Sequence, residues 1–167
     1  MATDENRFAP PLAHVEDVAQ SGSGTLAGRG TRLVAVLIDG LVSGFVFGLL
    51  TFVTPLTFTP PAGANLTRVL LINFVVGFTL FLLLHGYLIA TRGQTIGKAL
   101  LKMRIERSDG SPASFARIVG VRYLPTALLT TIPVLGGLYA LIDSLLIFRE
   151  SRRCLHDNIA DTIVVKA

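Results

Sequence analysis

The sequence has little cysteine, tryptophan or charge. Cys154 is the single cysteine, so the chain cannot form an internal disulfide. There is no tryptophan, so aromatic residues at a membrane interface would have to be phenylalanine or one of the three tyrosines. Charged residues make up 16% of the chain, whereas soluble domains carry about 25%. The shortage of charge argues against an ordinary soluble protein.

The sequence is instead rich in apolar residues. Hydrophobic residues make up 51% of its 167 residues, and the mean hydropathy is +0.62. A chain of this length forms one compact unit, which rarely buries so much apolar surface, so we expect lipid to cover the excess. The net charge is +4, and the basic residues flank apolar runs, which favours an anionic lipid surface over nucleic acid as the partner.

The N-terminal part of the sequence differs from the rest. Residues 1–28 contain acidic residues and no apolar core segment, so they do not resemble a secretory signal. The stretch AQSGSGTLAGRG is rich in Gly and Ser, which is typical of a flexible tether. We therefore expect residues 1–28 to be a disordered N-terminal tether and residues 29–167 to form a membrane domain.

Two long apolar runs predict membrane-spanning helices. They cover residues 33–53 and residues 69–90, which are 21 and 22 residues long, and a spanning helix needs about 20. The segment TPLTFTPPAGANLT between them contains three prolines and a glycine, which should end the first helix. Asn73 and His85 are the strongly polar side chains of the second run.

Residues 123–148 form a third apolar region, which Pro133 and a Gly-Gly pair interrupt. Such residues break or loosen a helix, so this region is either one kinked span or a hairpin of two short helices. Seven basic residues lie in residues 91–122 and four in residues 149–167. Because cytoplasmic loops carry excess Lys and Arg, charge favours the hairpin, with both termini on the cytoplasmic side of the cell (inner) membrane.

Two short segments have the character of strands. LKMRIE alternates apolar and charged residues, and DTIVVK is rich in β-branched residues. The two are candidates for pairing as a short cytoplasmic β-ribbon. The expected fold is thus an all-α integral membrane protein with two transmembrane helices, a Pro/Gly-broken third membrane region and this ribbon.

Four segments together resemble the RDD family of small multi-pass membrane proteins. They are RLVAVLIDG, RGQTIGKALLKMRI, SDGSPASFARIVGVRYLP and LIDSLLIFRESRRCLHDNIADTIVV, in the order typical of the family. The family is named for an arginine and two aspartates in its hydrophobic segments, which match Arg32, Asp39 and Asp143 here. The resemblance implies little about activity. Some members are linked to sodium–proton exchange, and a eukaryotic relative resembles an assembly factor of a membrane ubiquitin-ligase complex.

The charged residues of the apolar segments are the main candidates for a site. Arg32 and Asp39 are seven residues apart, which puts them on nearly one helix face but about 10 Å apart along its axis. Because intramembrane acids usually face the bundle interior and pair, we expect a buried polar cluster of Arg32, Asp39 and Asp143, with Arg122. The cluster serves either as a structural ion pair, as an ion or proton site, or in docking a partner.

A glycine face and a histidine are further candidates within the spans. Gly40, Gly44 and Gly48 are spaced four apart, which predicts close helix contact either with the second span or in a homodimer. His85 either relays protons or makes a hydrogen bond between helices.

The stretch GQTIGK is similar to a phosphate-binding loop but departs from it. It has three residues between its glycines instead of four, and Ala follows its lysine, so we expect no nucleotide. We expect a tight turn at the membrane surface, with Lys98 and Arg92 facing lipid phosphates.

The stretch CLHDN places Cys154, His156 and Asp157 together. No second ligand pair exists for a metal site, and no nucleophile is visibly paired with a base, so we expect neither a metal nor hydrolysis. His156 and Asp157 are expected to cap a helix end or to pair with Arg152 or Arg153.

The sequence as a whole predicts a membrane protein without enzyme activity or a cofactor. The favoured function is a membrane scaffold or assembly factor, and the alternative is a cation/proton transporter of the sodium–proton type or a subunit of one. The expected partners are anionic lipid headgroups, a second copy of the chain or another membrane protein, and sodium or protons.

Overall fold

The computed structural model describes residues 24–53, 63 and 65–167. Residues 1–23 of the expected tether, and most of the segment between the two long apolar runs, lie outside the described residues. The elements, with η1 a π-helix and η2 a 3-10 helix, follow in this order: α1 (Arg29–Val53), α2 (Leu66–Arg92), α3 (Ile96–Leu100), β1 (Met103–Arg107), η1 (Arg117–Tyr123), α4 (Leu124–Thr130), α5 (Leu135–Leu145), η2 (Leu146–Phe148), α6 (Leu155–Ile159) and β2 (Thr162–Lys166).

Among the described residues, α1 and α2 are the two helices long and apolar enough to cross a membrane. They have 25 and 27 residues, or about 38 and 40 Å at 1.5 Å per residue. The rest of the chain buries only 6% of the most apolar window of each helix, so neither is the core helix of a soluble fold. The Asn65 side chain caps the first turn of α2, and Gly93, with φ 64°, ends it. Both predicted apolar runs lie inside these helices.

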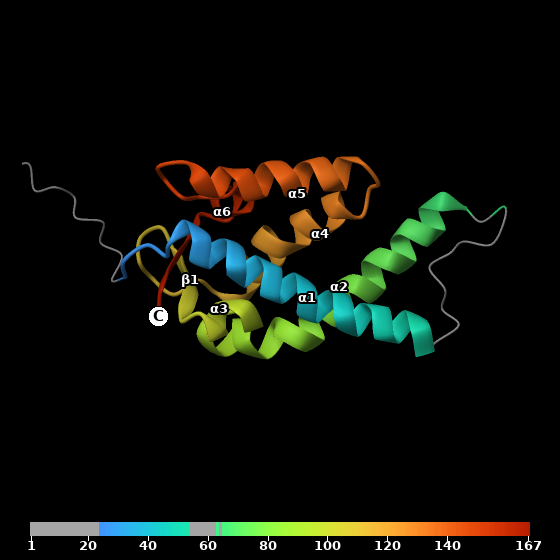
Figure 1. Ribbon diagram of the computed structural model, residues 1–167, viewed down its shortest axis with the longest axis horizontal. Helices are drawn as coiled ribbons and strands as arrows, with labels where there is room; N and C mark the ends of the chain where they lie inside the picture. The colour runs from blue at the N-terminus through green and yellow to red at the C-terminus, as the bar shows by residue number, and fades with distance from the viewer. Residues whose placement is uncertain (1–23, 54–62, 64) are drawn as a thin grey trace, which may run out of the picture.

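The third apolar region folds back on itself. A turn over residues 131–134 separates α4 from α5, and α5 returns alongside α4 (Figure 1). Gly136 permits this return, because a Cβ there would lie 2.6 Å from the Thr130 carbonyl oxygen. The two arms, residues 117–130 and 135–148, have 14 residues each. Residues 117–148 therefore form two short helical arms that fold back on each other rather than one continuous helix.

Strands β1 and β2 pair antiparallel over all five residues of each. The segment before α1 joins this ribbon, since the Ala27 N–H donates to the Val164 carbonyl and the Lys166 N–H donates to the Thr25 carbonyl, both at 3.0 Å. The contacts of the domain therefore begin before the expected boundary after residue 28. The start of α1, the ribbon and the end of α5 all lie at one end of the molecule, on the left in Figure 1.

Helix α3 packs against α1 with almost no space between them. A Cβ at Gly97 would collide with the Ala35 carbonyl oxygen of α1, so only glycine fits at this position. The predicted glycine face is different: Gly40, Gly44 and Gly48 are exposed, and an added Cβ at any of them would meet no atom within 4 Å. That face therefore does not join α1 to another described part of the chain.

We predict that Gly97→Ala destabilises the fold by about 1–3 kcal/mol, the usual cost of overpacking, because its methyl group would push α3 away from the α1 backbone. Gly44→Ala is the matched control and should be neutral or slightly stabilising, since alanine favours a helix more than glycine does. Thermal unfolding in detergent, followed by circular dichroism, compares the two variants. Equal unfolding temperatures for them would contradict the tight α1–α3 contact.

Candidate functional site

A buried carboxylate shared by two arginines forms the first of three polar centres. Asp157 Oδ2 lies 2.5 Å from Arg32 Nη2, and Asp157 Oδ1 lies 2.7 Å from Arg122 Nη2. None of the three side chains is more than 5% exposed. Charged groups are buried at tolerable cost only when they are paired and hydrogen bonded, and these are. Asp157 thereby connects α1, η1 and α6.

The local sequence holds Asp157 in place. It is the third residue of α6, and its Oδ2 accepts the Cys154 N–H at 3.1 Å while the Cys154 sulfur accepts the Asp157 N–H. This is a capping box in which cysteine takes the place of the usual Ser or Thr. Burial works to raise the pKa of Asp157, but Arg122 and Arg32 hold that pKa well below its usual range. Burial raises the pKa of the Cys154 thiol to about 12.

The π-helix η1 carries Arg122 to this centre. Pro125, at the start of α4, has no N–H to donate to the Val121 carbonyl, as a residue of a regular α-helix would. The wider π-helical turn lies just before it, and Arg122 in its last turn is 1% exposed. Arg32, in the first turn of α1, also donates to the Arg152 carbonyl, in the segment that precedes α6.

Asp39 belongs to a second, separate centre. Its Oδ2 accepts the Thr95 hydroxyl at 2.6 Å, and its Oδ1 accepts the Gly97 N–H at 2.6 Å. Thr95 is the N-cap residue of α3, and its own side chain does not cap the helix. Asp39 therefore caps α3 from a neighbouring helix, where the exposed N–H groups favour a negative charge. Lys98 Nζ lies 3.9 Å from Asp39 Oδ2 and offsets that charge.

His85 completes the second centre from α2. Its Nδ1 accepts the Ile96 N–H at 3.3 Å, and its Nε2 lies 3.3 Å from the Ser43 hydroxyl. Because Nδ1 accepts, the neutral ring carries its proton on Nε2 and donates to Ser43. His85 is 1% exposed and lies 3.9 Å from the Asp39 carboxylate. The ring thus links α1, α2 and α3.

Asp143 and His156 form the third centre. His156 Nδ1 lies 2.6 Å from Asp143 Oδ2, and the His156 backbone N–H donates to Asp143 Oδ1 at 3.2 Å. On the other side of the ring, Arg122 Nη2 lies 2.9 Å from His156 Nε2. A guanidinium group only donates, so Nε2 accepts and the ring proton sits on Nδ1, toward Asp143. Burial and the charge of Arg122 lower the pKa of His156, which keeps the ring neutral.

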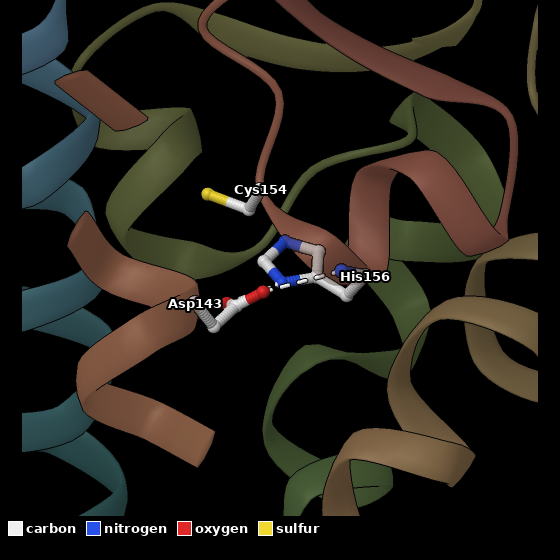
Figure 2. Close-up of side chains that lie close together, drawn as sticks. All are labelled: Asp143, Cys154 and His156. Atoms are coloured by element: carbon white, nitrogen blue, oxygen red, sulfur yellow. Dashed lines mark hydrogen bonds and ion pairs between the residues drawn. The ribbon is translucent and has the colours of Figure 1, made fainter. Parts of the chain in front are cut away.

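Cys154 lies beside this pair, which makes a trio of metal-ligating residue types. The ligand atoms of Asp143, Cys154 and His156 lie within 4.8 Å of one another. Figure 2 shows the carboxylate facing the imidazole, with the sulfur to one side of the pair. A metal on Nδ1 would force the ring proton onto Nε2, where it would oppose an Arg122 N–H. The hydrogen bonds of the trio therefore disfavour a metal at this nitrogen.

The three centres meet at one cavity of about 330 Å³. Its wall includes both histidine–carboxylate pairs, Lys98 and Arg122, together with apolar residues of α1 and the α4–α5 hairpin. The Asp39 and Asp143 side chains are 17% and 12% exposed, so both keep some access to this space. Most of the accessible wall is apolar, and these carboxylates, histidines and Lys98 are the groups that could bind water or a small ion there.

The predicted cluster of Arg32, Asp39, Asp143 and Arg122 does not form as one ion-paired unit. Both arginines form ion pairs with Asp157. Asp39 accepts hydrogen bonds at the start of α3, and Asp143 interacts with His156. Arg32 and Asp39 do not pair, because Asp39 caps α3 while Arg32 points to α6. The four residues are brought together only as lining of the shared cavity.

The prediction that Lys98 faces lipid is also wrong. Lys98 is 7% exposed, and its Nζ lies 3.4 Å from the Thr95 hydroxyl, because α3 turns this side chain toward Asp39. Arg92, in the last turn of α2, is exposed.

Sequence reasoning missed Asp157 as the central carboxylate. The expected helix cap is present. The Asp157 carboxylate, however, pairs with Arg32 and Arg122 rather than with Arg152 or Arg153, and Arg153 donates instead to the Asp157 backbone carbonyl at 3.4 Å. The available signal was the capping-box spacing of Cys154 and Asp157, which fixes the carboxylate at a helix start. Nothing in the local pattern indicates a partner 125 residues away.

The fold and the three centres define a small, mostly helical membrane protein, with two apolar helices that could span a bilayer. Residues 26–161 match the RDD family, and the chain belongs to that family. The match includes every residue of the three centres. Searches of curated proteins and of solved structures found no similar protein.

We predict that Asp157→Asn lowers the free energy of unfolding by about 3–5 kcal/mol, the usual cost of breaking a buried ion pair, since two buried arginines lose their partner. Asp161→Asn is the control, because Asp161 is exposed and pairs with Arg153 at the surface. Its effect should be small, since ion pairs at the surface contribute little to stability. Denaturant unfolding in mixed micelles measures both. If Asp157→Asn lowered the free energy of unfolding no more than the control does, the central role of Asp157 in stability would be contradicted.

We predict that acid destabilises the protein through His156. Its folded-state pKa lies below the unfolded value of about 6.5, so its contribution to stability is full above that pH. The contribution falls as the pH drops from about 6.5 toward the folded-state pKa, because only the unfolded state then takes up the proton. His156→Gln removes the titration, and its unfolding temperature should fall less between pH 7 and pH 5 than that of the wild type. Parallel pH profiles would contradict the assignment.

Proposed function

We propose that this RDD-family protein exchanges a small monovalent cation, with sodium as the first candidate, for protons across the membrane. Asp143 is the proposed binding carboxylate. The observation that carries the proposal is the position of Asp143 on the wall of the 330 Å³ cavity, without a lysine or arginine within ion-pair distance among the described residues.

A comparison of the three carboxylates supports Asp143. Asp157 is offset by two arginines and is fully buried, so it has no free capacity for a cation. The charge of Asp39 is offset by the N-terminus of α3 and by Lys98. Asp143 interacts with His156, whose ring is neutral, and Arg122 reaches it only through that ring. Its negative charge is therefore the least compensated of the three, which favours a cation in the adjoining space.

The chemistry of exchange follows from one carboxylate with two alternative ligands. A proton on Asp143 removes the charge that attracts a cation, and a bound cation lowers the proton affinity of the same group. The two ligands thus compete for Asp143. His156 donates its Nδ1 proton to Oδ2, which keeps the carboxylate oriented while its ligand changes. No enzyme chemistry or cofactor enters this proposal.

The proposed orientation places both termini and the β-ribbon in the cytoplasm. Basic residues support it: they are frequent after α2 and after the hairpin, and cytoplasmic segments carry excess Lys and Arg. The segment before α1 lies on β2, so it shares the side of the ribbon. The proposed location is the cell (inner) membrane.

A scaffold or assembly factor is the second candidate. The observation that favours it is the face of α1 with Gly40, Gly44 and Gly48, which is exposed and open to a partner helix. Small residues let two helix backbones approach closely in a membrane. This function does not require the cavity of the three centres.

The test is sodium-driven proton flux in proteoliposomes, read with a pH-sensitive dye. We expect flux with the wild type, and its loss by at least about tenfold with Asp143→Asn, since a neutral amide lacks the charge that binds the cation. Asp161→Asn is the matched control and should keep wild-type flux, because Asp161 lies on the surface away from the cavity.

Absence of flux from well-folded wild-type protein, with sodium, lithium or potassium, would overturn the exchange proposal. That result would favour the scaffold or assembly factor as the function. Equal flux from Asp143→Asn and the wild type would retain transport but reject Asp143 as the binding group.

A further inference from the structure

We propose that a second cavity, at the end of α2, binds the headgroup of an aminophospholipid with a primary ammonium group, of the phosphatidylethanolamine type. This cavity has a volume of about 650 Å³ and lies between the last turn of α2, β1 and the turn that follows β1. Sites for small ligands typically measure about 300–1,000 Å³. The cavity shares no lining residue with the cavity of the three polar centres, so the inference does not depend on the proposed function.

Glu106 is the first observation that points to a ligand. This residue of β1 is 4% exposed and lines the cavity. Its Oε1 lies 2.5 Å from Arg104 Nη2, but its buried Oε2 has no hydrogen-bond partner among the described residues. A buried carboxylate oxygen without a partner costs free energy, which a donor from a ligand would recover. The missing partner is therefore a hydrogen-bond donor, and a positively charged one suits a carboxylate best.

Two arginines on the same cavity supply the opposite charge. Arg104 lines the cavity, is partly exposed, and has a buried Nε without a hydrogen-bond partner. Arg92 also lines it, is exposed, and has no ion pair among the described residues. Arginine binds phosphate through several N–H groups at once. The cavity thus offers two arginines, from α2 and β1, for an anion, and the β1 carboxylate of Glu106 for an ammonium group.

The place of the cavity in the fold indicates a lipid as the source of these groups. Ile89 and Ala90, in the last turns of the apolar helix α2, form part of its wall, and Arg92 ends that helix. The cavity therefore lies where a spanning helix leaves the hydrocarbon, at the depth of lipid headgroups. The apolar residues suit the start of the acyl chains, while the arginines suit the phosphate.

The pair of charges also selects among phospholipids. A phosphatidylglycerol headgroup has the phosphate but no cation for Glu106. A phosphatidylcholine headgroup has the cation but no N–H to donate to Oε2. An ethanolamine headgroup has both a phosphate and three N–H donors, so it satisfies both sides of the cavity.

The test is native mass spectrometry of the full chain released from nanodiscs. The nanodiscs contain equal amounts of phosphatidylethanolamine, phosphatidylcholine and phosphatidylglycerol with identical acyl chains. We expect the wild type to retain phosphatidylethanolamine about tenfold over phosphatidylcholine, the effect of one hydrogen bond to a charged group. This comparison needs no variant, so it does not depend on whether a substitution folds.

Three variants locate the effect. Glu106→Gln should abolish the preference for phosphatidylethanolamine over phosphatidylcholine, and Arg104→Gln should reduce retention of all three lipids. Arg107→Gln is the matched control, because this neighbouring arginine on β1 pairs with Asp109 and does not line the cavity. It should behave as the wild type.

Equal retention of the three lipids by the wild type, or a preference for phosphatidylglycerol, would overturn the proposal. Soluble glycerophosphoethanolamine supplies the same polar groups without acyl chains. If it displaced the lipid at equal concentration, the site would serve a soluble ligand, and the assignment to a lipid would be wrong.

Discussion

The structure depends on one carboxylate with two arginines. Asp157 and Arg122 are fully buried and Arg32 is buried; the two arginines reach the carboxylate from η1 and α1. Each of these charges would be costly at this depth without the others. The capping box of α6 fixes the position of the carboxylate, and the arginines then fix two apolar elements relative to it. The contacts that fix these elements relative to one another are therefore ion pairs at one end of the bundle. The exposed apolar surfaces of α1 and α2 contribute little to the arrangement.

The other two centres depend on this arrangement. Because Arg122 donates to His156 Nε2 as well as to Asp157, it determines which ring nitrogen carries the proton, and so directs a donor at Asp143. Asp39 is left without an arginine and is satisfied by the start of α3 instead. The outcome is three carboxylates with different charge compensation, of which Asp39 and Asp143 line the cavity and Asp157 lies buried behind its arginines.

Local sequence patterns predicted the elements better than the contacts between them. Hydrophobic length was enough for α1 and α2, since lipid-facing helices need little else. Spacing along a helix shows which residues share a face, but not which other element packs against that face. It therefore suggested that Arg32 and Asp39 belong to one polar cluster. Gly97 was overlooked for the same reason. Glycine is required there because the Ala35 backbone, which is distant in sequence, leaves no room for a side chain. The partners of Asp157 depend on the assembled fold.

The ribbon has a consequence for the order in which the protein matures. The segment made just before α1 is held by β2, which follows every other described element in the chain. Both apolar helices are therefore synthesised before β2, the strand that pairs with the segment preceding α1. Arg32 likewise precedes its partner Asp157 by 125 residues in the chain. Contacts between such distant segments form slowly. The ribbon and the buried charge network can therefore be completed only after both long helices have been synthesised.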